Sequence, residues 1–446
     1  MQKKHFFQIL LIITLISNIN QLAFAAQPIV LRNADSLLGI TFGNNQVRHF
    51  VGNVMFEQGT IIITCDTAVQ YIEENRVDLS GNVVIDQNSM KIKSPLINYN
   101  GNTRLAVAKR NVEIQDTNNI LNAESGNYDF DTKIAEFKDN VTLTNDSMVI
   151  YAKHLINNTG NDESFADGDV QVFGKYVRTA LISDTLIHKP KQSFTLAYGN
   201  AGFFYIDTVK KGAKPSDYPN EWHLKTEEER LKLMQTKFDT LSIFSRTIFG
   251  NQMKGQEFFQ FLDSVEICKG SISSKCDKAD YFKTGDSLIL TGNPIVWYDN
   301  LQLFADTINV IFPKRQLQSI KLFNNSFAIS EADSLGLGRI NQISGKNIDL
   351  NFANDSINCI ISKNNATSLY FMTDDSGETG AQSSGADTIT IFFEANDVSN
   401  ILWRSAAFID FYPERIFPVD IKTLYLPRFR MRDDIPERKK FPIKSK

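Results

Sequence analysis

The feature that most constrains this chain is a sequence repeat with a period of 29 residues. A Gly-Asn-Val triplet or a close variant recurs five times without one insertion between the copies. The copies are marked by Asn53, Asn82, Asn111, Asn140 and Asp169. The same frame returns at Ser264 and Asn293, which are again 29 residues apart. A repeat of this kind is typical of arrays in which each structural unit packs only on its neighbours, so the chain is expected to form one extended array.

Within each repeat, hydrophobic residues alternate with polar ones. Val77, Leu79, Val83 and Ile85 are apolar, and the residues between them are mostly polar. This period of two predicts strands with one face inside and one face in water. Each repeat therefore predicts two strands of about ten residues, one of them bent at the Gly-Asn pair, where a positive φ or a bulge is tolerated. The expected fold is all-β: an elongated, open β-jelly-roll, a V-shaped trough of stacked, bent antiparallel strands.

Composition excludes several function classes. The formal net charge is −4, which argues against a general nucleic-acid binder. With five His and four Cys, a metal cluster is not expected. The sequence lacks a Gly-x-Ser-x-Gly elbow and a complete phosphate-binding loop, and the histidines share no common frame with an acid or a nucleophile. We therefore expect no catalytic residues, no metal, no cofactor and no enzyme activity.

The ends of the chain differ from the array. Lys3 and Lys4, an apolar run and a small-x-small pattern predict a cleavable signal peptide, with cleavage near Ala25-Ala26, and therefore an exported protein. Between the two strand arrays, Thr226 and Glu229 form a capping box, and apolar residues from Leu224 to Leu241 recur at spacings of seven, three and four residues, so a helix is predicted over about 221–241. The Gly- and Ser-rich residues 373–387 are expected to form a loop. The predicted boundaries are 1–25 (signal peptide), 26–210 (first array), 211–257 (linker with the helix), 258–412 (second array) and 413–446 (basic tail).

The Gly-Asn-Val strands and two later segments carry a resemblance to a known family. Gly292-Asn293-Pro294-Ile295-Val296-Trp297 and Gln302-Leu303-Phe304-Ala305-Asp306 resemble the OstA-like family of lipopolysaccharide-transport proteins, in particular its long Bacteroidota-type branch. The resemblance implies a periplasmic β-jelly-roll whose apolar groove carries the acyl chains of lipopolysaccharide toward the outer membrane. It also implies two kinds of protein partner: other jelly-roll transport proteins, contacted edge to edge, and an outer-membrane assembly protein. The chain departs from the short bridge protein of the family by its length, its helix and its basic tail.

A trough for acyl chains would be lined by the inward apolar residues of the repeat. At any single position, a side chain that packs in a filled core is the simpler interpretation. The trough interpretation requires only some of the inward rows to face a lipid. The groove candidates are Val54, Phe56, Val83, Ile85, Val112, Ile114, Val141, Leu143, Met148, Ile150, Val170 and Val172.

Several alternatives stay open at the sequence level. The same strands could form an exported non-enzymatic scaffold or adhesin, and a β-helical polysaccharide lyase would also show repeats and carboxylates. Cys276 and Cys65 occupy a slot that other copies fill with Ser or Ala, which favours core packing, although a Cys268–Cys276 disulfide is an alternative. Asp-Ser or Asp-Thr pairs, such as Asp66-Thr67, resemble O-glycan acceptor sites, but they also fit the starts of strands.

Overall fold

The computed structural model describes the chain in two compact units, residues 1–137 and 138–446. The described residues are 27–42, 45–176, 178–210, 226–234, 237–251, 253, 255–313, 316–332, 339–353, 356–373, 379–394, 397–418 and 420–442. The predicted signal peptide, residues 1–25, lies outside them. Among the described residues, no helix has the length and hydrophobicity needed to cross a membrane.

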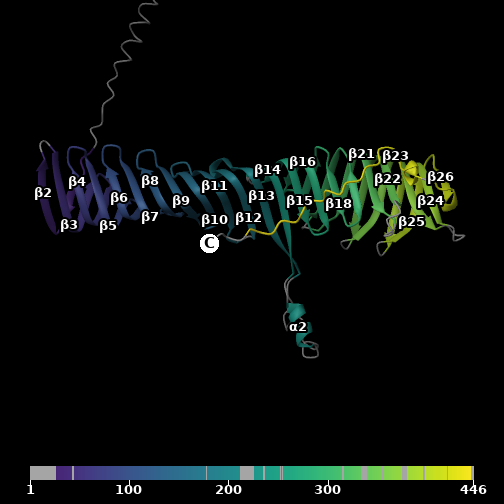
Figure 1. Cartoon of the computed structure of the whole chain (residues 1–446), viewed down its shortest axis with the longest axis horizontal. Coiled ribbons are helices and arrows are strands. Elements are labelled where there is room, and N and C mark those ends of the chain that lie inside the picture. The colour runs from purple at the N-terminus through teal and green to yellow at the C-terminus, as the bar shows by residue number, and fades with distance from the viewer. Residues whose placement is uncertain are drawn as a thin grey trace, which may run out of the picture. The chain divides into compact units, whose positions relative to one another are not determined.

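The first unit consists of strands that follow one another along the chain (Figure 1). They are β1 (Val30–Asn33), β2 (Ser36–Phe42), β3 (Asn45–Gln58), β4 (Ile61–Tyr71), β5 (Arg76–Gln87), β6 (Met90–Asn100), β7 (Leu105–Gln115) and β8 (Ile120–Asp129). From β3 onward each strand pairs antiparallel with the next, while β1 and β2 both pair with β3. The boundary between the units falls inside β9 (Ile134–Thr144).

The second unit continues the same antiparallel pattern. Before the inserted helix α2 (Glu227–Met234), its strands are β10 (Met148–Asn158), β11 (Glu163–Gly174), β12 (Thr179–Lys189) and β13 (Phe194–Lys210). The strands that follow are β14 (Lys237–Asn251), β15 (Phe258–Lys269), β16 (Ile272–Phe282), β17 (Ser287–Thr291), β18 (Ile295–Tyr298), β19 (Leu301–Phe304), β20 (Thr307–Ile311), β21 (Ser319–Glu331), β22 (Ile340–Ala353), β23 (Ser356–Thr373), β24 (Thr379–Glu394), β25 (Asp397–Arg404) and β26 (Phe408–Pro413). The all-β fold of stacked antiparallel strands predicted from the repeat is confirmed.

The predicted bends are present and have a common backbone geometry. At Gly81-Asn82, φ is +72° and +44°, and the register of β5 shifts between Ser80 and Val83. The same pair of positive φ values occurs at the other repeat positions, including Arg110-Asn111, where neither residue is glycine. Asparagine adopts this left-handed conformation more readily than most residues, which explains its recurrence in the repeat.

The bends bring the two halves of each strand face to face. Phe50 and Phe56 lie on opposite sides of the bend in β3, and their rings are 5.4 Å apart in an edge-to-face arrangement. Both side chains are buried. The core of the first unit is therefore enclosed between the two halves of its bent strands, as expected for the arms of a jelly-roll.

Asp-Ser and Asp-Thr pairs have a structural role at these bends. Asn82 Nδ2 donates a hydrogen bond to Asp66 Oδ2 at 2.9 Å, and Asn200 donates equivalently to Asp184 at 3.0 Å. The same contact joins Asn53 to Asp35 and Asn325 to Asp306. Aspartate thus recurs because it accepts a bond from the asparagine of the adjacent bend, a role that neither sequence interpretation included.

The inserted helix begins at the predicted capping box and ends earlier than predicted, and residues 221–225 of the predicted range lie outside the described residues. Glu229 N donates to Thr226 Oγ1 at 3.2 Å and Thr226 N donates to Glu229 Oε2 at 2.8 Å, so the capping box is confirmed. However, α2 spans only Glu227–Met234, and β14 begins at Lys237. The prediction of a helix to residue 241 was wrong because the spacing of apolar residues there belongs to a strand that pairs with β13.

Two further expectations need correction. Residues 379–387 of the predicted loop form the first half of β24, which pairs with β23 and β26. The four cysteines are free and buried. Cys276 lies opposite Val265 whereas Cys268 lies opposite Ser273, so the two side chains project to opposite faces of their sheet and cannot form the disulfide considered above.

Candidate functional site

The predicted groove residues all lie on the inward rows of their strands. In the first unit, Val54, Phe56, Val83, Ile85, Val112 and Ile114 are buried. In the second unit, Val141, Leu143, Ile150 and Val170 are buried, and Met148 and Val172 are half-buried. The structure therefore brings these side chains together as interior rows within each unit. Their contact with a lipid stays a prediction.

A cavity of about 360 Å³ lies in the second unit, at strands where no site was predicted from the sequence. Strand β23 lines it on both sides of the bend at Asn364-Asn365, with Ile357 and Ile360 before the bend and Leu369 after it. The cavity therefore lies between the two halves of the bent strands.

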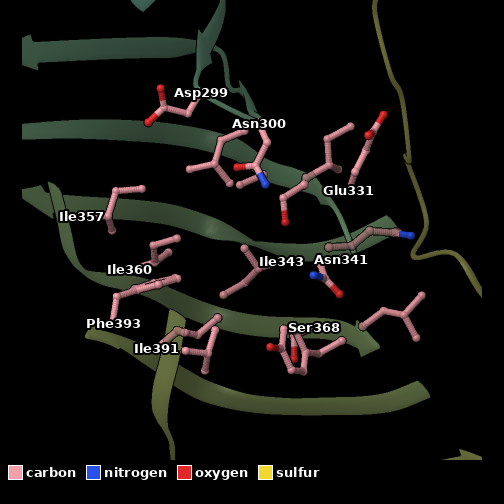
Figure 2. Close-up of a pocket in the computed structure, with 18 of the residues that line it drawn as sticks. Asp299, Asn300, Glu331, Asn341, Ile343, Ile357, Ile360, Ser368, Ile391 and Phe393 are labelled. Atoms are coloured by element: carbon pink, nitrogen blue, oxygen red, sulfur yellow. The ribbon is translucent and has the colours of Figure 1, made fainter. Parts of the chain in front are cut away.

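Most of the cavity wall is aliphatic or aromatic, and Figure 2 shows Ile343, Ile357, Ile360, Ile391 and Phe393 around it. An apolar wall can take up a hydrocarbon chain because each buried methylene contributes about 0.8 kcal/mol. The remaining apolar lining residues are Leu301, Ala328, Ile329, Leu369, Val398 and Ile401.

Polar groups gather at other parts of the lining. Asp299 and Asn300 come from the turn between β18 and β19, and Glu331 and Asn341 come from the facing ends of β21 and β22 (Figure 2). Burial and the nearby carboxylate of Asp397 raise the pKa of the Tyr370 hydroxyl, which also lines the cavity. A ligand that suits this lining has an apolar chain together with a group that can donate hydrogen bonds to carboxylates.

Interior polar atoms around the cavity form hydrogen bonds within the protein. Ser368 Oγ and Ser384 Oγ are 2.7 Å apart, and Asn341 Oδ1 accepts from Phe371 N at 2.9 Å. On the outer face of the same wall, Gln342 Nε2 donates to Ile340 O at 3.2 Å. These bonds fix the strand ends around the cavity and leave its aliphatic surface as the main contact for a ligand.

The sequence pattern could not locate this cavity because the repeat loses its period there. The bends at Asn293, Asn325, Asn365 and Ala406 are 32, 40 and 41 residues apart instead of 29. Inward rows could therefore be aligned only for the earlier strands. In this segment Ile357, Cys359 and Ile361 alternate along the strand, but Ile360 between them is also apolar. The pattern therefore does not show which face of the strand is interior.

Interior cysteines act as buried core residues. Burial, with a smaller contribution from Asp66, raises the pKa of the Cys65 thiol to about 11. Burial likewise raises the pKa of Cys276 to about 12. Both thiols are thus protonated at neutral pH, as expected for the compact filler predicted from their repeat slot. Within the described parts of the chain, no three His, Cys, Asp or Glu side chains are grouped so that they could hold a metal ion.

Comparison with known proteins gives one family match and a distant structural similarity. Comparison with curated proteins found no match. The structure of LptH, the LptA homologous periplasmic component of the conserved lipopolysaccharide transport device from Pseudomonas aeruginosa, is 11% identical, with a TM-score of 0.25. That similarity covers 32% of this chain and 93% of the LptH chain. Residues 26–210, which hold the regular 29-residue repeat, match the family described as OstA-like protein.

Proposed function

We propose that the protein is a periplasmic, non-enzymatic carrier or bridge for lipopolysaccharide, which shields the acyl chains of lipid A between the two halves of its bent strands. Support at the level of the family comes from the OstA-like match over residues 26–210. The observation that carries the proposal is the cavity between the strand halves, where 13 of the 21 lining residues are aliphatic or aromatic. Export through the predicted signal peptide belongs to the same proposal.

A photo-crosslinking experiment tests this function. A benzophenone amino acid is placed at Ile343 in the cavity or at Leu143 on the inward row, and at Thr142 as the matched control. Thr142 neighbours Leu143 but lies on the opposite, partly exposed face of β9. Lipopolysaccharide should be captured at Ile343 and Leu143 and not at Thr142. Capture at Thr142 alone, or at none of the sites in a folded and exported protein, would refute the carrier and favour the alternative of an exported scaffold or adhesin.

The proposed partners are proteins that add a strand at an edge of the array. In the described residues, β1 and β2 pair only with β3, and β25 and β26 pair only with β24. Apolar side chains are exposed on both edges, with Leu38 63% and Phe408 52% exposed. An unpaired edge with exposed apolar residues invites strand addition, whether by another jelly-roll transport protein or by an outer-membrane assembly protein.

Edge docking has its own test. Leu38→Lys places a charge on the β2 edge and should weaken association with an edge partner, because charged edge residues oppose strand addition. Arg48 lies on β3, the covered neighbour of β2, so Arg48→Lys serves as a conservative control. Association is measured by crosslinking to partner proteins. If Leu38→Lys gives as much of the crosslinked complex as the wild type, docking at this edge is excluded.

A further inference from the structure

The C-terminal residues 414–442, here called the strap, follow the last strand and lie across the strands of the second unit (yellow in Figure 1). At its near end, the ring of Phe417 packs edge-on against Phe371 of β23 at 6.1 Å. At its far end, the ring of Phe441 lies 6.3 Å from Phe173 of β11 and 5.9 Å from Phe204 of β13. The basic tail predicted from the sequence is thus a covering element of the sheet.

The strap covers the outer face of one sheet layer. All four residues of β18 are buried, and Trp297 alternates with Val296, so both faces of this strand are covered. On the Trp297 face the cover is the strap, whose Arg432 guanidinium lies 5.9 Å from the Trp297 ring and whose Arg430 lies 4.5 Å from the Phe304 ring. Tyr425, Leu426 and Phe429 pack on the same apolar cluster, which consists of Ile295, Trp297, Phe304, Phe327, Ile329 and Ile340.

Side chains, and not strand pairing, hold the strap to the sheet. Its described residues contain no strand, although Leu426 N donates to Gln342 Oε1 and Arg432 N donates to Gln302 Oε1, each at 2.9 Å. Lys275 Nζ lies 3.1 Å from Asp434 Oδ2. Release of the strap therefore breaks scattered side-chain contacts and leaves the backbone hydrogen bonds between the strands intact.

The strap and the cavity share two residues of the wall between them. Gln342 lines the cavity and accepts the hydrogen bond from Leu426 of the strap. Ile329 also lines the cavity and belongs to the cluster on which Leu426 and Phe429 pack. The wall formed by the ends of β21 and β22 is therefore held from outside by the strap while it faces the cavity on the inside.

We propose that the strap is a latch on this cavity: docked, it holds the β21–β22 wall in its closed position, and undocked, it lets the wall move and the bound chain leave. This inference rests on the proposed function, because it assumes that the cavity binds an apolar chain. When the strap leaves, the wall loses the packing on one of its two faces, and this lowers the free energy needed for the wall to open locally.

A fluorescent fatty acid, dansyl-undecanoic acid, serves as the probe with the full-length protein. The double substitution Leu426→Ala/Phe429→Ala removes the contacts of the strap with the wall and should raise the release rate of the probe about tenfold. Phe441→Ala is the matched control, because it removes an aromatic anchor of the same strap at β11 and β13 and should change release less than twofold. Amide hydrogen exchange at Gln342 and Ile343 should accelerate in the double variant and not in the control.

The outcomes separate the latch from the function on which it rests. If the wild-type protein binds no probe, the proposed function fails at this cavity, and the latch is then judged by exchange in β22 alone. If the probe binds but release and exchange are the same in the wild type and the double variant, the latch is wrong. Equal acceleration by Phe441→Ala would also overturn it, since loosening would then be general. Should the double variant not fold, Phe429→Leu gives the same comparison with a smaller expected change.

Discussion

Substitution of Gly81 by alanine tests whether the bend geometry determines the stability of the array. Gly81 has a φ of +72°, and a β-carbon added there would lie 2.4 Å from Asp66 Oδ2. That is too close for a real contact, so the Asp66 side chain would have to move. Its movement would break the 2.9 Å hydrogen bond that Asp66 accepts from Asn82. Two costs therefore combine at one site.

The expected magnitude follows from these two costs. An alanine in the left-handed region costs about 1–2 kcal/mol relative to glycine. Loss of the exposed hydrogen bond between Asn82 and the Asp66 carboxylate adds about 0.5–1 kcal/mol, less than for a buried one. Gly81→Ala should thus destabilise the protein by about 1.5–3 kcal/mol.

Urea unfolding measures the total cost, and amide exchange in β4 and β5 shows whether the loss is local. Asp66→Ala supplies the second arm of a double-mutant cycle. In the Asp66→Ala background, Gly81→Ala should cost only the backbone term, about 1–2 kcal/mol. One repeat later, Arg110 occupies the position equivalent to Gly81, with a φ of +66°, and Pro95 occupies the position equivalent to Asp66. A residue with a side chain is thus present where the aspartate is absent, which agrees with separate costs for backbone strain and for contact with the aspartate.

Two results would refute this reasoning. A loss below about 0.5 kcal/mol would mean that the bend readily adopts another conformation, since surface substitutions without a specific mechanism stay within that range. If Gly81→Ala costs as much in the Asp66→Ala background as in the wild type, the aspartate contact is irrelevant and the cost lies entirely in the backbone.

Three other predictions concern the helix, the cysteines and the strap. Thr226→Ala should destabilise α2 by about 1 kcal/mol, seen as faster amide exchange at Glu229, because Thr226 Oγ1 accepts that N–H. Cys65 and Cys276 should resist a thiol reagent in the native protein and react after urea unfolding, because burial raises both pKa values. The hydrogen bonds from Arg432 and Lys275 lower the pKa of Asp434. The Asp434 carboxylate should therefore stabilise the docked strap fully at pH values above the usual Asp pKa, and this stabilisation should be lost as the pH falls below that value. Amide exchange in the strap that does not change on acidification would contradict this prediction.

The bends could be predicted from the sequence because they are local. A glycine or asparagine that adopts a positive φ needs only its own backbone conformation, and the 29-residue spacing repeats that requirement at Asn82, Asn111 and Asn140. The capping box at Thr226 was predictable for the same reason, since both of its hydrogen bonds join residues three positions apart.

Features that depend on distant pairing were not predictable in the same way. The heptad-like spacing that ends at Leu241 suggested a helix, but pairing with Tyr205 of β13 places that residue in a strand. Gly380 and Gly385 suggested a loop, yet the rings of Phe411 and Phe408 on β26 pack where their β-carbons would be. In both cases tertiary packing outweighs the local preference.

The outer faces of the two units carry different chemistry, and this difference identifies where a cover is required. In the first unit the outward row holds ion pairs such as Lys93–Glu113, with 2.8 Å between Nζ and Oε1, which suits a solvated face. In the second unit the four consecutive apolar residues from Ile295 to Tyr298 have no polar alternate, a pattern typical of a strand covered on both faces. The sequence therefore contained a signal that something covers this strand. It could not identify the cover, because the hydrogen bond that seats the strap there joins Arg432 to Gln302, 130 residues away, and neither residue is distinctive in its own segment.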